Sequence, residues 1–474
     1  MATIEAPADH LDLGEHNHHA VGLRRDALSP TETLAQSIAN IAPTLTPAVN
    51  LQLVFGSSGS GTWFTYLLAT LGLLLIGVCI KQFAKKTSTP GALYSYVSMS
   101  LGPTAGFITG WALILAYLTT GIAVASYIVP YAQTLLKNIH VALPALVVFV
   151  VVVGLVWFVA YRDVRLSAKM MLALEGVSIT LILILGAATI AHTGLHLGPQ
   201  LSLKGMTLNG LQGGMVLGVF SFVGFESATA LGAEAKDAKR SIPRAVFMST
   251  AIAGAFFILT SFIMVSAFST YKTHLDDANL VALPAMAEMA HAPLLGVLVS
   301  FGAVVSLFAC ALACVTATSR IVLSMSRDGL LHASLGRSHS SNSTPHVAAT
   351  VCAIIMLLAL VGLSLKGYVP LDIYNMNGTI ATYGFLIAYV LLAIGAVRSA
   401  SRDKSLSPWL IFSAVVGTLF MGLAVKGSVM PWPTAPDNDL PYVFAAYMAL
   451  GIGWMLLGRR RPRPAIVFSA GDSQ

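Results

Sequence analysis

The sequence predicts an all-α polytopic membrane protein with twelve transmembrane helices. The chain has 474 residues, of which 56% are hydrophobic and only 10% are charged, and its mean hydropathy is +0.78. A soluble domain of this size does not need so much apolar surface. The apolar residues form unbroken runs long enough for bilayer-spanning helices, whereas a membrane β-barrel would show short alternating segments.

Twelve runs of about 18 residues or more follow one another along the chain. We place the predicted spans at 32–56, 62–83, 103–136, 141–161, 166–192, 209–235, 243–269, 293–325, 346–366, 370–397, 408–427 and 438–458. Two segments between them are too short or too polar to cross a bilayer. We expect a re-entrant or surface helix at 87–102 and a short helix over the outer mouth at 276–291.

The positions of the basic residues test this assignment. With the N-terminus placed inside, 22 of the 27 lysine and arginine residues lie on the inner side, in connections or at the adjacent span ends, and 5 lie on the outer side. Such a bias in successive loops indicates the correct number of spans. It predicts a multi-pass protein of the cytoplasmic (inner) membrane with both termini in the cytoplasm. The net charge of +7 is therefore a consequence of topology, and no nucleic-acid partner is expected.

Neither the cysteines nor the histidines of the sequence indicate a cofactor or a metal site. The four cysteines lie inside apolar runs and are expected to be free, buried thiols: Cys79, Cys310, Cys314 and Cys352. The first 30 residues lack the apolar core of a signal peptide, and the histidines at 16–19 are expected to belong to a disordered tail. The remaining histidines show no metal-ligand spacing.

Two predicted spans carry interruptions near their middles. The first reads "SIANIAPTLTPAVN", in which Pro43 and Pro47 each remove a backbone donor, and the sixth reads "FSFVGFESA", in which Gly224 weakens the helix. Unwound backbone at this depth is tolerated only where it lines a cavity within the protein. Because the two spans hold corresponding places in two halves of five, the pattern indicates an inverted-repeat transporter. The alternative is two ordinary helix kinks.

Three separated stretches carry a family resemblance. "FSFVGFESATALGAEAKDAKRSIPRA" closely resembles the sixth-helix signature of amino-acid permeases of the amino acid–polyamine–organocation (APC) superfamily. "TPGALYSYVSMSLGPTAGFITGW" (89–111) and "SRDGLLHASLGRSHSSNSTPHVA" (326–348) are similar to the stretches before helix three and after helix eight of that superfamily. His332 stands where the family usually has proline. The similarity covers roughly residues 30 to 460.

The resemblance implies the LeuT-type fold, a five-plus-five inverted repeat with two additional C-terminal helices. We therefore expect a disordered cytoplasmic tail at 1–30, a transport core at 31–397 and two further spans within 398–460. The inverted repeats would cover about 31–192 and 209–397, and a cytoplasmic tail would occupy 461–474.

The resemblance also implies a substrate site at the two helix breaks. Positions aligned with substrate contacts are Asn40, Ile41, Thr44 and Leu45 in the first span, Ala116, Tyr117 and Gly121 in the third, and Cys314 in the eighth. The amides of Thr44, Leu45 and Thr46 are expected to hold a substrate carboxylate, although proline replaces the glycines usual there. Phe220 aligns with the aromatic residue that closes over substrate. The carbonyls of Phe220, Ser221 and Val223 align with the ammonium site, and Tyr383 is a weaker candidate.

Two carboxylates inside the predicted membrane are candidates for coupling or gating. Glu226 lies beside the sixth-span break and matches an acidic residue that the family uses in proton-linked gating. Glu175 lies in the fifth span, one turn before the position at which some relatives carry a coupling lysine. Intramembrane ionisable residues indicate function by default. The alternative for each is a structural acid held by hydrogen bonds. Glu234 and the charged residues after it are expected in a solvated loop, with an inner-gate contact as the other possibility.

These observations predict a secondary active transporter, not an enzyme. The expected activity is alternating-access movement of an amino acid or related amine, with proton-coupled uptake (symport) as the first hypothesis and exchange as the second. A membrane-embedded enzyme, a channel or a transporter-like sensor are the hypotheses from other classes, and no HExxH or GxSxG motif supports the enzyme. The expected partners are the small-molecule substrate, a coupling proton and the lipid bilayer. The sequence leaves open the substrate, sodium as the coupling ion, and the oligomeric state.

Overall fold

The computed structural model describes residues 27–86, 91–137, 140–141, 143–162, 164–271, 274–275, 280–430, 432–433, 435 and 437–458. Both predicted tails therefore lie outside the described residues, except for residues 27–30, and so do the histidines at 16–19. The described chain is helical, and its extended backbone is limited to one isolated parallel bridge between Leu28 and Ala235.

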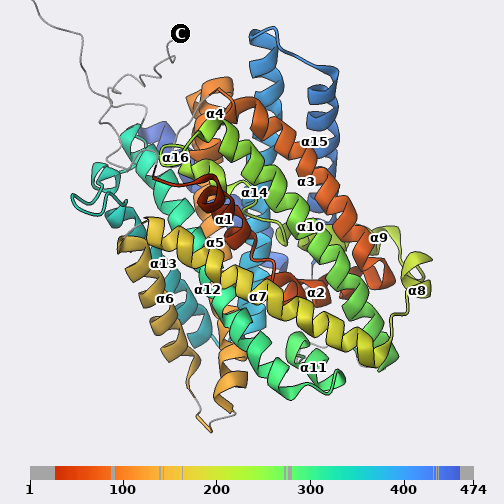
Figure 1. The fold of residues 1–474 in the computed structure, drawn as a ribbon. Coiled ribbons are helices and arrows are strands. Elements are labelled where there is room, and N and C mark those ends of the chain that lie inside the picture. The colour runs from red at the N-terminus through yellow and green to blue at the C-terminus, as the bar shows by residue number, and fades with distance from the viewer. Residues whose placement is uncertain are drawn as a thin grey trace, which may run out of the picture.

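The described residues form sixteen α-helices, packed in one bundle (Figure 1). Their bounds are α1 (Pro30–Ile41), α2 (Leu51–Ser58), α3 (Thr62–Ala84), α4 (Ala92–Leu101), α5 (Pro103–Lys137), α6 (Ala145–Arg162), α7 (Val164–Thr193), α8 (Gly198–Leu201), α9 (Leu208–Phe220), α10 (Ala238–Thr270), α11 (Ala282–Met289), α12 (Pro293–Arg327), α13 (His346–Leu365), α14 (Pro370–Arg402), α15 (Pro408–Val429) and α16 (Leu440–Gly458). At the centre, α5 packs against both α12 and α14, and α1 packs against α7, α10 and α12.

The predicted membrane spans are confirmed as apolar helices. Ten segments of the described chain are long and apolar enough to cross a membrane. The first of them, Pro30–Ala84, contains two predicted spans, and the shorter apolar helix α9 begins the sixth, so all twelve predicted spans have a counterpart. Their predicted ends lie within about five residues of the observed ones, because helices such as α10 and α14 continue past the apolar run that located them.

The two short predicted helices are also present. α4 lies within the predicted 87–102 segment, and α11 lies within the predicted 276–291 segment. They occupy opposite ends of the bundle (Figure 1). We call the end at which α3, α6, α12 and α14 finish the basic side. There Lys86 after α3 pairs with Asp403 after α14, and Thr344 bonds the carbonyl of Tyr161 in α6 at 2.8 Å.

The first span is interrupted after α1. Ala42 adopts a left-handed conformation (φ 48°), and the chain turns through Pro43 before it re-enters a π-helical segment, Thr46–Asn50, that leads into α2. Proline disfavours helical backbone in the residue before it, which explains the position of the break. Pro47 lies in the first turn of the π-helical segment, not in the gap, and there its missing N–H costs no hydrogen bond.

The sixth span is interrupted after α9. Residues 221–226 form successive turns, and the chain then continues as a short 3₁₀ segment, Ser227–Leu231. Gly224 sits in these turns with φ +91°, a conformation that glycine adopts without a steric penalty. The two interruptions are separate in sequence, yet α1 packs directly against the 3₁₀ segment. The helix breaks that the sequence pattern indicated thus lie together inside the bundle.

Candidate functional site

The two helix breaks touch through Asn40 and Gly224. A Cβ atom on Gly224 would lie only 2.4 Å from Nδ2 of Asn40, so the absence of a side chain allows this approach. The other groups of Asn40 face α12: its carbonyl accepts from Sγ of Cys310 at 3.3 Å and its Oδ1 from Sγ of Cys314 at 3.1 Å. Nδ2 is buried and has no hydrogen-bond partner among the described residues. The site therefore holds an unused donor where the breaks meet.

Glu226 joins the sixth-span break to two other helices. It is fully buried, its Oε1 accepts from the hydroxyl of Tyr117 in α5, and its Oε2 accepts from the hydroxyl of Tyr389 in α14, each at 2.7 Å. The ring of Phe385 packs edge-on against Tyr117, with centroids 4.9 Å apart. Both carboxylate oxygens are thus held by donors from α5 and α14, two helices that pack against each other.

Glu175 makes the corresponding connection at the first-span break. From α7, its Oε1 accepts from the amide and the hydroxyl of Thr44, both at 3.4 Å, and its Oε2 accepts from the hydroxyl of Ser306 in α12 at 2.6 Å. The side chain is buried. A buried carboxyl group therefore links α7 and α12 to the unwound backbone of the first span.

Aromatic side chains close the bundle on the side of the breaks away from the basic side. The rings of Phe220 and Tyr374 meet edge to face with centroids 5.8 Å apart, and Tyr127 packs against Tyr374 at 5.4 Å. The hydroxyl of Tyr374 donates to Oδ1 of Asn50 in the first span at 2.6 Å. Phe220 and Tyr374 are buried. The cluster separates the breaks from that end of the molecule.

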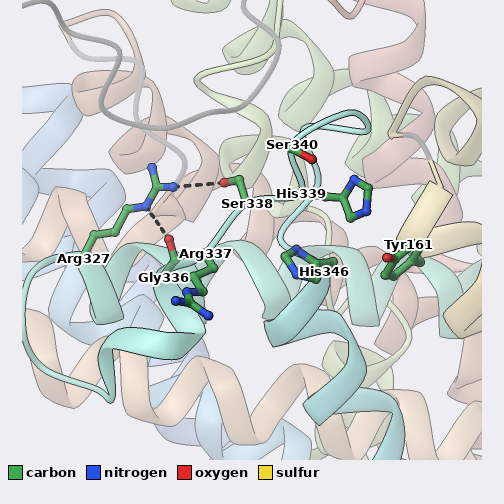
Figure 2. A pocket seen from close by; sticks show the side chains of 8 residues that line it. All are labelled: Tyr161, Arg327, Gly336, Arg337, Ser338, His339, Ser340 and His346. Atoms are coloured by element: carbon green, nitrogen blue, oxygen red, sulfur yellow. Dashed lines mark hydrogen bonds between the residues drawn. The ribbon is translucent and has the colours of Figure 1, made fainter.

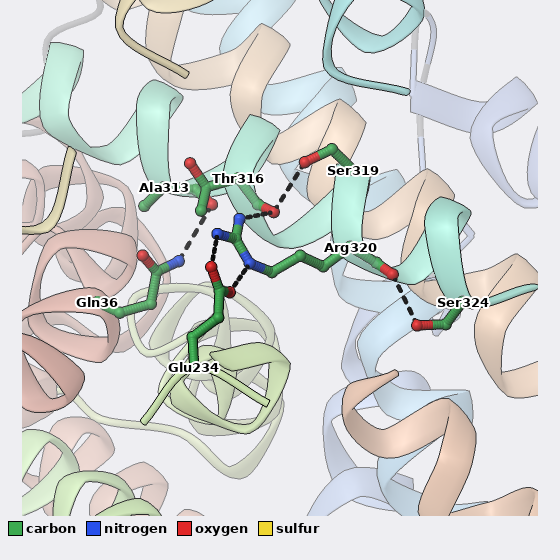
Figure 3. Close-up of polar contacts among 7 residues, drawn as sticks. All are labelled: Gln36, Glu234, Ala313, Thr316, Ser319, Arg320 and Ser324. Carbon is green, nitrogen blue, oxygen red and sulfur yellow. Dashed lines mark hydrogen bonds and ion pairs between the residues drawn. The ribbon is translucent and has the colours of Figure 1, made fainter. Parts of the chain in front are cut away.

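A buried ion pair joins α12 to the chain after the sixth-span 3₁₀ segment (Figure 3). Arg320 of α12 donates from Nε to Oε2 of Glu234 at 2.6 Å and from Nη2 to Oε1 at 3.1 Å, and its Nη1 donates to the carbonyl of Thr316. Both charged side chains are buried. Beside them, Leu28 before α1 pairs with the backbone on either side of Ala235. The residues just before the first span are therefore hydrogen-bonded to the residues that follow the sixth.

Comparisons with known proteins identify the family. The family model described as "Amino acid permease" matches residues 33–452. The chain belongs to this family. It is 22% identical over 85% of its length to the branched-chain amino acid permease BcaP of Bacillus subtilis (strain 168), of which 83% is covered. It is 24% identical to the low-affinity putrescine importer PlaP of Escherichia coli (strain K12), with 83% of each chain covered.

The fold comparison agrees with this membership. A Na⁺-coupled sialic acid symporter, solved in a substrate-bound outward-open state, superposes with a TM-score of 0.56, covering 85% of the permease and 90% of that chain. The identity is 11%, so the likeness concerns the fold alone. The predicted LeuT-type architecture and APC membership are confirmed, and the protein is a permease and not an enzyme.

The other residues singled out from the sequence surround the two breaks of the permease. Gly121 of α5 faces Cys314, because a Cβ there would lie 3.4 Å from Cβ of Cys314. The side-chain oxygens of Ser221 and Tyr66 lie 3.4 Å apart and are hydrogen-bonded. Several more are buried in the same region without a polar side-chain contact: Ile41, Leu45, Ala116 and Val223.

The amides expected to hold a carboxylate are engaged in this conformation. The amide of Leu45 bonds the carbonyl of Ala42 at 2.8 Å, that of Thr46 bonds Pro43 at 3.3 Å, and that of Thr44 points to Glu175. The break closes into tight turns because its polar groups have no other partner at this depth. The hydroxyl of Thr46 is buried and without a partner among the described residues.

Some important contacts of the permease were missed or misplaced from the sequence. Tyr383 packs against Phe444 of α16, with ring centroids 5.5 Å apart, and it is Tyr389, six residues later, that reaches Glu226. Arg320 is one of the 22 basic residues assigned to the inner side, although it falls inside the predicted eighth span (293–325), and Glu234 was expected in a solvated loop. Both are buried in an ion pair. A signal was available, because a charge within an apolar run requires a partner.

Proposed function

We propose that this permease is a secondary active transporter that takes up an amino acid by proton-coupled alternating access across the cytoplasmic membrane. The proposed topology has both termini in the cytoplasm, which makes the basic side the cytoplasmic side, as the excess of lysine and arginine there indicates. Family membership supports transport of amino acids or amines. The direction, the ion and the narrower substrate class are inferred from the geometry at the breaks.

The observation that carries the proposal is the contrast between three buried glutamates. Glu234 is neutralised by Arg320, whereas Glu175 and Glu226 receive hydrogen bonds only from hydroxyl groups and amides and form no salt bridge among the described residues. A carboxyl group without a cation can gain or lose a proton without breaking an ion pair. Each of the two also touches a helix break, the part of the fold that changes in alternating access.

Protonation of Glu226 would alter the contacts between helices. As a carboxylate it accepts one hydrogen bond on each oxygen, from Tyr117 and from Tyr389. A protonated carboxyl must donate from one oxygen, so one tyrosine hydroxyl has to turn or leave. The proton is thereby coupled to the contact of the sixth-span break with α5 or α14. Glu175 offers a second such position, because its proton would compete with the donors from Thr44 and Ser306.

The residues at the breaks favour a substrate without a charged side chain. The buried Nδ2 of Asn40 and the hydroxyl of Thr46 are unused polar groups suited to a substrate carboxylate. The carbonyl of Phe220 at the end of α9 accepts from the amide of Val223 at 3.0 Å, so the carbonyls of Ser221 and Val223 in the following turns are the proposed acceptors for a substrate ammonium. Both oxygens of Glu226 and of Glu175 already have hydroxyl or amide donors, so a basic side chain would have to displace one of these bonds to pair with either carboxylate.

The test uses purified protein in liposomes with an imposed pH gradient. Radiolabelled leucine, alanine and putrescine are compared in wild type, Glu226→Gln and Glu175→Gln, with the exposed Glu288→Gln as the matched control. We expect saturable uptake of a neutral amino acid that an acidic exterior accelerates. The Glu226→Gln variant should lose the acceleration while it still binds substrate, and Glu288→Gln should behave as wild type.

Four outcomes would contradict the proposal. Uptake that requires preloaded internal substrate would indicate exchange. Uptake that follows a sodium gradient at constant pH would show that sodium, and not the proton, is the coupling ion. Transport of putrescine alone would overturn the neutral-substrate assignment. A Glu226→Gln variant with unchanged pH dependence would remove Glu226 from coupling and leave Glu175 to be tested by the same measurement.

A further inference from the structure

A second site lies on the basic side, away from the helix breaks. A cavity of about 710 Å³ opens between the end of α6, the end of α12, the loop that follows it and the start of α13 (Figure 2). Tyr161, Arg327 and His346 line it from these three helices, and Arg337, Ser338 and His339 line it from the loop. None of these residues takes part in the transport mechanism proposed above.

The cavity wall is positively charged and carries no carboxylate. Two arginines line it, and none of its lining residues is acidic. Arg327 is oriented by the loop, because its Nε donates to the carbonyl of Gly336 and its Nη2 to the hydroxyl of Ser338, both at 3.0 Å. Arg337 is exposed beside it. Guanidinium groups stay protonated at any physiological pH and match the geometry of phosphate oxygens.

The two histidines add oriented donors. Nδ1 of His339 accepts from the amides of Ser341 and Asn342 at 3.3 and 3.2 Å, which places the ring proton on Nε2. The rings of His339 and His346 lie 5.2 Å apart at 90°, with Tyr161 packed against both. Nδ1 of His346 is buried and has no hydrogen-bond partner among the described residues. The site thus offers charge and donors together.

The surroundings place this cavity at the edge of the lipid. The helices that carry Tyr161 and His346, α6 and α13, present apolar side chains outward along their length, with Phe158 46% exposed, Ile354 52% and Leu358 66%. Trp157 bonds Thr350 at 2.9 Å and joins these two faces near their basic ends. In a membrane protein such faces contact acyl chains, and an aromatic residue at their end marks the headgroup level.

We propose that the cavity binds the phosphate group of an anionic phospholipid whose acyl chains lie along α6 and α13. The chemistry recognised is a phosphate ester held by two guanidinium groups and imidazole donors. The volume lies in the range of ordinary small-molecule sites and admits a glycerophosphate headgroup. A soluble phosphate would meet the same groups but would leave the adjacent apolar faces unused.

The experiment measures lipid retention by native mass spectrometry of the full-length protein. Phosphatidylglycerol and phosphatidylcholine are titrated separately against wild type, Arg337→Gln, Arg337→Glu and the matched control Arg402→Gln. Arg402 is an exposed arginine on the same side, outside the cavity. Inorganic phosphate is added in a separate arm as the soluble probe. Because Arg337 is exposed, its replacement leaves the fold intact.

We expect wild type to retain phosphatidylglycerol in preference to phosphatidylcholine. Loss of one arginine should weaken this binding about fivefold and charge reversal still more, whereas Arg402→Gln should have little effect. Equal losses in the Arg337 and Arg402 variants, or no lipid preference, would overturn the site. A further contrary result is that inorganic phosphate binds with the same dependence on Arg337 and abolishes the preference for phosphatidylglycerol over phosphatidylcholine. That result would overturn the proposal that a lipid occupies the cavity.

Discussion

The ion pair between Glu234 and Arg320 gives the sharpest prediction about closure of the basic side. Arg320→Gln removes the bidentate partner of a buried carboxylate, which then remains without a cation. Removing one partner of a buried pair costs about 3–5 kcal/mol. If this cost falls on the closed conformation, the equilibrium between closed and open shifts by a factor of more than about 100, since 1.4 kcal/mol is tenfold.

The assay uses Cys314 as a reporter of opening. This thiol is buried against Asn40, six residues and about 9 Å along α12 from Arg320. The other three cysteines are replaced by alanine, and a membrane-impermeant maleimide is applied from the basic side of oriented vesicles. We expect the Arg320→Gln variant to be labelled much faster than wild type. The double variant Glu234→Gln/Arg320→Gln should be labelled more slowly than the single variant, because no unpaired charge remains.

The matched control is the exposed pair Lys86–Asp403 on the same side. Its members are 40% and 48% exposed, so Asp403→Asn should change the equilibrium by less than about 1 kcal/mol. A second background that retains only the buried Cys79 of α3 reports general unfolding. Unchanged labelling of Cys314 in a folded Arg320→Gln protein would refute the reasoning. So would a double variant labelled as fast as the single one.

Three further predictions concern single positions. Gly224→Ala should abolish transport and destabilise the fold by roughly 2–5 kcal/mol, because its Cβ would meet Asn40 and its φ is +91°. Tyr389→Phe should slow pH-driven uptake about tenfold, since Glu226 loses a buried donor worth about 1–3 kcal/mol. Burial raises the pKa of Asp328 more than its hydrogen bond from a tyrosine lowers it. Ionisation of this carboxyl group therefore destabilises the folded state as the pH rises above about 4. The Asp328→Asn variant should accordingly have a higher Tm than wild type, by a difference that grows above that pH.

Each of these has a matched comparison. Gly154→Ala in α6 meets no atom within 4 Å and should leave stability and transport unchanged, so an equal loss there would refute the steric argument. Tyr447→Phe removes a hydroxyl that bonds Trp111 outside the core, and an equal effect on uptake would remove the special role of Tyr389. For Asp328, the difference in Tm between variant and wild type must shrink at low pH, and a constant difference would contradict the linkage.

Much of the fold followed from the sequence because its signals are local. Each span is a continuous apolar run. The breaks occur at Pro43 and Gly224, where a regular helix cannot continue without strain. The candidate site followed only in part. Glu175 and Glu226 stood out as carboxylates in apolar surroundings, but the pattern did not distinguish Tyr389 from Tyr383, since both lie on one apolar helix.

The sequence by itself therefore determined the number of spans, the places of the two breaks and the family. Only the tertiary structure decided which polar groups meet. Glu226 and Tyr389 are 163 residues apart, Glu175 and Thr44 are 131 apart, and Glu234 and Arg320 are 86 apart. These contacts depend on how each helix is rotated against its neighbours. Because lipid-facing and protein-facing sides of a membrane helix are both apolar, hydropathy carries little information about that rotation, and packing and polar pairing fix it.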